Sequence, residues 1–113
     1  MRVLVAHPER APTRSDFEIA FLAFAERYGL PRALLNTEVA GHEADIYFPD
    51  HRLVIELDGY ETHGLRSQFE ADRDRDADLL AAGIATVRLT WERFCLMPAR
   101  EADRLHAIIR AQR

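Results

Sequence analysis

The segment from residue 36 to residue 60 contains two stretches rich in β-branched and aromatic residues, "NTEVAGHEADIYFPD" and "HRLVIELDGY". Such stretches favour β-strands, and Pro49, Asp50 and His51 between them are typical of a turn. The pattern predicts a β-hairpin, with a shorter strand before it at residues 36–39. If the turn is centred on Asp50 and His51, paired residues have numbers that sum to 101, as these two do.

This register places Asp45 directly opposite Glu56. Residues in such a pair have Cβ atoms roughly 4.5 to 5.5 Å apart, and two like charges there are destabilising, so a positive group is expected between them. Because side chains alternate along a strand, Glu56 and Asp58 share one face. The opposite face carries the apolar residues Leu53, Ile55 and Leu57. The hairpin is therefore expected to gather three carboxylates on one side.

A helix is predicted before the hairpin, from Ser15 to about Tyr28. Aromatic residues recur there at spacings of three and four, which is the stripe of an amphipathic helix, and Gly29 and Pro31 end it. The members of the stripe are Phe17, Phe21, Phe24 and Tyr28.

Three further elements are predicted after the hairpin. A helix should span residues 65–82 and stop at Gly83, and "IATVRLTW" at residues 84–91 is typical of a mostly buried strand. A final helix is expected at residues 99–111. Its inner side would carry Ala102, Leu105, Ile108 and Ile109.

The predicted element order is α-β-β-β-α-β-α, which indicates an α/β fold: a small mixed sheet of four strands, flanked by helices. At 113 residues the chain can bury one substantial core, so residues 15–113 are expected to form a single domain. Residues 1–14, with Pro8 and Pro12 among charges, are expected to form a tether.

Two aspartates stand out on the helix predicted at residues 65–82. Its apolar side is expected to carry Leu65, Phe69, Leu79 and Leu80. Asp72 and Asp76 fall in the middle of that side on a helical wheel, where a carboxylate is costly unless it is paired or liganded. They therefore either support a site or pair with buried arginines, for which Arg75 and Arg88 are available. Solvent is expected around Glu70, Asp74 and Asp78.

Glu18 and His63 are further candidates for a site. The stretch "SDFE" matches a capping box in which Ser15 is the N-cap and Glu18 bonds back to it, although Glu18 also lies at the edge of the apolar stripe and can lean into a site. His63 lies in the turn "GYETHG", where Gly59 and Gly64 permit sharp bends. A histidine there can act as a general acid or base near neutral pH.

Composition excludes several classes of protein. No apolar run approaches the roughly 20 residues of a membrane helix, and the start lacks the long apolar region of a signal peptide, so a cytoplasmic protein is expected. The single cysteine, Cys95, excludes an intrachain disulfide and a multi-cysteine zinc site. All 15 basic residues are arginine, which rules out a catalytic lysine. Because the net charge is −4, nucleic acid would have to bind at a local arginine patch.

Oxygen-rich ligands without cysteine suit a hard cation such as Mg²⁺ or Mn²⁺. Such a cation is usually held by one or two carboxylates together with a phosphate substrate, so phosphodiester hydrolysis is the expected reaction. The metal would lower the pKa of a bound water and offset charge in the transition state, while His63 moves a proton.

Three segments, "SDFE", "EADIYFPDHRLVIELDGYETH" and "DRDRDADLLAAGIATVRLTW", resemble in this order an uncharacterised family of small domains. That family is similar to the very short patch repair endonucleases, within the PD-(D/E)XK nuclease superfamily. The resemblance covers roughly residues 15 to 95. It implies a restriction-endonuclease-like core and metal-dependent cleavage of DNA.

The resemblance also implies roles for five residues. Asp45 would be the first metal-binding aspartate, and Glu56 the second acidic ligand. Glu18, His63 and Asp72 would match the outer glutamate, the histidine and the helix aspartate of the repair nucleases.

This sequence departs from the family pattern in three ways. Asp58 stands where the superfamily expects lysine, which gives His63 more weight. Cys95 alone cannot supply the cysteines that help to bind the structural zinc of the repair nucleases, so no structural zinc is expected. The chain is also shorter than those enzymes, and domains like it are often the C-terminal part of longer proteins. A fused or separate DNA-recognition domain is therefore an expected partner.

Two functions follow from these patterns. The first is a Mg²⁺-dependent DNA endonuclease domain, with Arg52, Arg66 and Arg73 as candidate phosphate contacts because they lie near the motif. The second is a catalytically weak or inactive nuclease-fold module that serves as a binding or regulatory domain of a defence or repair system. The missing lysine and the acidic net charge support the second. In a third, purely structural interpretation the same acids only cap turns and helices and make salt bridges.

Overall fold

The computed structural model of the chain describes residues 12–59 and 66–112. His63 and residues 1–11 of the predicted tether lie outside this description. The elements, in chain order, are α1 (Arg14–Arg27), β1 (Leu34–Val39), β2 (His42–Phe48), β3 (Leu53–Asp58), α2 (Arg66–Ala81), β4 (Ala85–Thr90), α3 (Trp91–Leu96) and α4 (Pro98–Ala111). The order differs from the predicted one only by the short helix α3.

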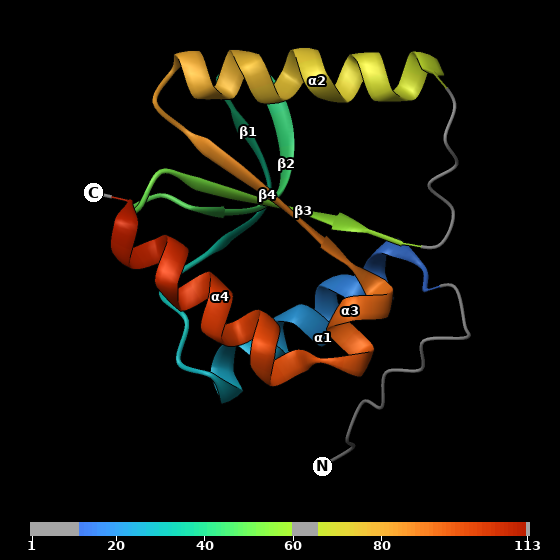
Figure 1. The fold of residues 1–113 in the computed structure, drawn as a ribbon, viewed down its shortest axis with the longest axis vertical. Coiled ribbons are helices and arrows are strands. Elements are labelled where there is room, and N and C mark those ends of the chain that lie inside the picture. The colour runs from blue at the N-terminus through green and yellow to red at the C-terminus, as the bar shows by residue number, and fades with distance from the viewer. Residues whose placement is uncertain (1–11, 60–65, 113) are drawn as a thin grey trace.

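The four strands form one mixed sheet in the order β1-β2-β3-β4. Pairing is antiparallel between β1 and β2 and between β2 and β3, whereas β3 and β4 are parallel and joined through α2. Helix α2 covers one face of the sheet, and α1, α3 and α4 lie on the other side (Figure 1). The predicted α/β class with a flanked four-stranded mixed sheet is confirmed. No helix in the described ranges is long and apolar enough to cross a membrane.

The predicted register of the hairpin is confirmed. Phe48 pairs with Leu53, and Ile46 pairs with Ile55, so that paired numbers sum to 101. The pairing of β2 with β3 ends at Ile46, one step before Asp45 would meet Glu56. The two carboxylates therefore lie where the strands stop pairing.

Strand β2 is irregular at Asp45. Ala44 packs in the small apolar cluster that contains Leu79 of α2, whereas Ile46 packs in the main core on the other face. Residues two apart share a face in a regular strand, so the alternation breaks between them. On β1, Asn36 lies between the residues that pair with Ile46 and Ala44, and it has a φ of 48°. A left-handed backbone suits asparagine better than most residues. The break leaves the Asp45 side chain in a gap in the ladder.

The main core joins α1 to the sheet and to the C-terminal helices. Phe17 is 2% exposed, and its ring lies 4.9 Å from that of Trp91, edge to face. Leu105 of α4 packs in the same cluster, as the predicted inner side of that helix requires. The aromatic stripe of α1 is thus its buried face, as the spacing predicts.

The predicted capping box of α1 is wrong by two positions. Thr13, not Ser15, is the N-cap: its hydroxyl accepts from the Asp16 N–H at 3.0 Å, and the Asp16 carboxylate accepts from the Thr13 N–H at 3.3 Å. Threonine and aspartate three positions apart make this box as well as serine and glutamate would. Glu18 therefore has no part in capping, and its carboxylate is available for another contact.

The predicted inner face of α2 is only partly correct. Leu79 is 1% exposed, but Phe69 and Leu80 are 56% and 69% exposed. The helix is turned so that Asp72 and Arg75 approach the sheet, where their side chains are 17% and 21% exposed. The physical reason is that charged groups on the sheet need partners, and these two side chains supply them. Leu79 is consequently the one fully buried apolar anchor of the described part of α2.

We expect Leu79→Ala to destabilise the protein by about 2 to 4 kcal/mol, because it leaves a cavity between α2 and the sheet. The matched control is Leu80→Ala, at an exposed position on the same helix, which should change stability by about 0.5 kcal/mol or less. The free energy of unfolding from urea titrations measures both. Equal losses in the two variants would contradict this orientation of α2.

Candidate active site

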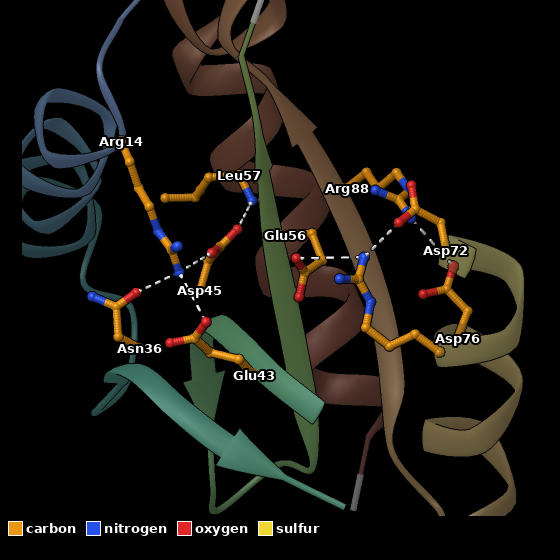
Figure 2. A network of polar contacts seen from close by, with 10 residues as sticks. Arg14, Asn36, Glu43, Asp45, Glu56, Leu57, Asp72, Asp76 and Arg88 are labelled. Carbon is orange, nitrogen blue, oxygen red and sulfur yellow. Dashed lines mark hydrogen bonds and ion pairs between the residues drawn. The ribbon is translucent and has the colours of Figure 1, made fainter. Parts of the chain in front are cut away.

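Asp45 is fixed by two hydrogen bonds at the break in β2 (Figure 2). Its Oδ2 accepts from the backbone N–H of Leu57 in β3 at 2.8 Å. Its Oδ1 accepts from Nη2 of Arg14 in α1 at 3.0 Å. The side chain thus takes over a strand-to-strand contact beyond the last backbone pair, and this sets where its carboxylate lies.

Glu56 is the neighbouring carboxylate, and its side chain is only 9% exposed. The pKa of Glu56 is raised from 4.5 to about 7: burial is the largest cause, the negative charge of Asp45 is the second, and the positive charge of Arg75 opposes the rise. The protonated carboxyl shares a hydrogen bond with Asp45, which also raises this pKa. Oε2 of Glu56 is buried and accepts no hydrogen bond from the described part of the chain. Asp45 and Glu56 are therefore close enough for the charge of one to shift the pKa of the other.

These two carboxylates fit a hard divalent cation. Mg²⁺ and Mn²⁺ prefer oxygen ligands, keep several waters and need only one or two protein carboxylates when a phosphate substrate completes the shell. The buried Oε2 of Glu56 is an acceptor that such a cation would satisfy. Within residues 12–59 and 66–112 no group of three or more acidic, histidine or cysteine side chains could hold a metal. The fit thus depends on the pair alone.

A chain of ion pairs joins Glu56 to α2. Nη2 of Arg75 lies 3.6 Å from Oε1 of Glu56 and 3.3 Å from Oδ1 of Asp72. On the other side of Asp72, Nη2 of Arg88 lies 3.2 Å from Oδ2, and it is 3.8 Å from Asp76. Asp72 and Asp76 both pair with arginines, which is one of the two predicted alternatives. Asp72 also fits the other alternative, support of a site, because Arg75 connects it to Glu56.

Glu18 lies on the other flank of the site. Its Oε2 is 3.3 Å from Nε of Arg14, the same guanidinium that binds Asp45. Glu18 is thus connected to Asp45 through Arg14. Instead of one positive group between Asp45 and Glu56, two arginines flank the pair: Arg14 of α1 contacts Asp45, and Arg75 of α2 contacts Glu56.

The remaining predicted residues differ in their placement. Asp58 ends β3 two residues after Glu56, is half-buried and pairs in register with Thr90. Arg73 is exposed on α2, and Arg66 is the first residue of that helix. The structure does not bring Arg52 to the site, because it precedes β3 and lies four residues, or about 13 Å along the strand, from Glu56.

The sequence reasoning missed Arg14 and Asn36 as members of the site. Nη2 of Arg14 donates to Oδ1 of Asn36 at 2.8 Å as well as to Asp45. One signal was present: Arg14 and Glu18 have the i, i+4 spacing of a helical ion pair once the cap is placed at Thr13. The Asn36 contact depends on the break in the hairpin, which no local pattern indicates.

The raised pKa of Glu56 predicts a stability that falls with pH. A carboxyl whose pKa is higher in the folded state contributes most stability below its unfolded value of 4.5, and this contribution is lost as the pH rises to about 7. Glu56→Gln cannot ionise. In EDTA, the difference in unfolding free energy between variant and parent should therefore move in favour of the variant by roughly 3 kcal/mol from pH 4.5 to 8. The exposed Glu26→Gln is the control, and a flat difference for Glu56→Gln would disprove the assignment.

Comparison with solved structures finds this fold in a nuclease. The catalytic domain of the homing endonuclease I-Bth0305I matches with a TM-score of 0.69 at 12% sequence identity, and the match covers 83% of this chain and 93% of that domain. No protein-family model and no curated protein sequence matches the chain. At this identity the likeness carries the fold and no residue roles. The chain therefore has the nuclease-like fold of an endonuclease catalytic domain, with the four-stranded mixed sheet and flanking helices that the sequence predicts.

Proposed function

We propose that the chain is a DNA endonuclease domain that hydrolyses phosphodiester bonds with Mg²⁺ or Mn²⁺, similar to the very short patch repair nucleases. The observation that carries the proposal is the carboxylate pair of Asp45 and Glu56, held at the point where β2 and β3 stop pairing in a nuclease-like fold. A buried acid with a strongly raised pKa beside a second acid is typical of a functional site.

In this proposal Asp45 and Glu56 hold the cation, which when bound supplies Lewis-acid chemistry and offsets charge on the phosphate. Asp45 is oriented by the Leu57 N–H, so its carboxylate needs little reorganisation. Glu56 must lose its proton before it can act as a ligand. With a pKa of about 7, its carboxyl is mostly ionised slightly above neutral pH. Cation binding should therefore release protons near pH 7.

The other residues have supporting roles. Asp72 and Glu18 are positioning residues, because Asp72 acts on Glu56 through Arg75 and Glu18 acts on Asp45 through Arg14. His63 is proposed to move a proton, since Asp58 occupies the place of the usual lysine. The substrate is DNA, and a further domain, fused or separate, would recognise it.

One observation favours the alternative function, a binding or regulatory module with weak or no catalysis. Each carboxylate of the pair already has an arginine near it: Arg14 at 3.0 Å from Asp45 and Arg75 at 3.6 Å from Glu56. Ion pairs of this kind offset part of the charge of each acid without a metal. The cleavage experiment separates the two functions.

Supercoiled, single-stranded and mismatched DNA should be incubated with the protein and Mg²⁺ or Mn²⁺. We expect nicking by the wild-type chain, and losses of about 100-fold or more in Asp45→Asn and Glu56→Gln, because each removes one charged ligand of the cation. Rates of conversion of supercoiled to open-circular DNA measure the effect.

The control is Glu70→Gln, which changes an exposed glutamate of α2 and should leave the rate unaltered. Cleavage that persists in Glu56→Gln would remove the assigned role of that residue. If no substrate is cut but DNA is bound equally by wild type and Asp45→Asn, the binding module is the better description.

A further inference from the structure

Arg14 contacts four polar side chains at the edge of the site, and Figure 2 shows Asn36, Glu43 and Asp45 around it. Its Nε lies 3.3 Å from Glu18, and its Nη2 lies 2.8 Å from Asn36, 3.0 Å from Asp45 and 3.8 Å from Glu43. The side chain is nevertheless 56% exposed. One guanidinium thus serves three carboxylates while staying open to solvent.

The contact with Asp45 conflicts with the proposed cation. A divalent ion shared by Asp45 and Glu56 would place a second positive group against a carboxylate that Arg14 already neutralises. Two cations at one carboxylate repel each other, and the repulsion is strong because the Asp45 side chain is only 16% exposed. Binding of the ion must therefore weaken the bond between Arg14 and Asp45.

Arg14 can give up Asp45 without being buried unpaired. Its exposure leaves the guanidinium in water, and Glu18 still holds Nε from the same helix. Since the guanidinium starts within hydrogen-bond distance of a proposed cation ligand, a phosphate bound to that cation would lie within its reach. Arginine forms strong charge-assisted bonds with phosphate, often two at once.

We propose that Arg14 is a phosphate-binding residue that exchanges Asp45 for a phosphate of the DNA when a divalent cation binds at Asp45 and Glu56. This inference rests on the proposed function. It makes cation binding and DNA binding favour each other. The cation takes up Asp45, the DNA phosphate takes up Arg14, and in the absence of both these two side chains bind each other. Such coupling is reciprocal for binding free energies.

The test compares wild type with Arg14→Met and with Arg32→Met. Arg32 is the matched control, because its side chain is 62% exposed and its ion pair, to Asp50 at 3.6 Å, lies at the surface away from Asp45 and Glu56. Calorimetry without DNA measures the affinity for Ca²⁺ or Mn²⁺. Fluorescence anisotropy of a short labelled DNA duplex measures the affinity for DNA, once in EDTA and once in Ca²⁺. Gel electrophoresis after each titration checks that the duplex has not been cut.

In Arg14→Met the cation should bind about three- to tenfold more tightly than in wild type, because the competing charge is gone. The gain in DNA affinity that Ca²⁺ gives to wild type should be smaller in this variant by about the same factor. In Ca²⁺, the magnitude of the slope of log DNA affinity against log salt concentration should decrease by about one, because one phosphate contact is lost. Arg32→Met should keep the wild-type cation affinity and the wild-type gain.

Two results would overturn the inference in distinguishable ways. If wild type binds the cation and Arg14→Met binds it no more tightly, the exchange is wrong while the proposed metal site stands. If neither protein binds the cation, the metal site of the proposed function is wrong and the exchange falls with it. Circular dichroism confirms folding of each variant. Arg14→Lys, which keeps the charge but not the forked geometry, should lie between wild type and Arg14→Met.

Discussion

The carboxylates of Asp45 in β2 and Glu56 in β3 repel each other where the pairing of these strands ends. The helices on the two faces of the sheet supply positive charges that offset part of this repulsion. Arg14 approaches Asp45 from α1, and Arg75 approaches Glu56 from α2, so each helix layer supplies one positive charge. The offset is incomplete, because the pKa of Glu56 still rises to about 7. An arrangement that leaves a buried acid so poorly satisfied is costly for stability, and such a cost is typical of a site kept for binding or chemistry.

The sequence predicts most of the fold because its strongest signals are local. The aromatic stripe of α1 and the turn at Asp50 fix one helix and one register, and this register brings Asp45 near Glu56, one step beyond the last pair of β2 and β3. The short helix α3 is missed because it follows β4 without a break: Thr90 ends the strand and caps the helix. A local pattern cannot separate two elements that share a boundary.

Apart from the misplaced cap of α1, the errors occur where charged groups meet across the fold. On α2 the apolar residues Phe69 and Leu80 point outward, because Asp72 and Arg75 find partners on the sheet that a helical wheel does not contain. Arg14 is missed for the same reason, since three of its four partners lie on the strands β1 and β2 and not on α1. Apolar periodicity predicts which elements form, whereas long-range ion pairs decide how an element is rotated against its neighbour.

The uneven attachment of α2 has a consequence for motion. Near its C-terminal end the helix is anchored by Leu79, but the part around Asp72 is held through ion pairs, and Phe69 contributes little buried area. Apolar burial resists opening more than partly exposed ion pairs do, so α2 should open from the Asp72 side at a lower free energy than global unfolding. The half of the site that holds Glu56 in place would then open and close as a separate cooperative unit, and added salt would favour its open form.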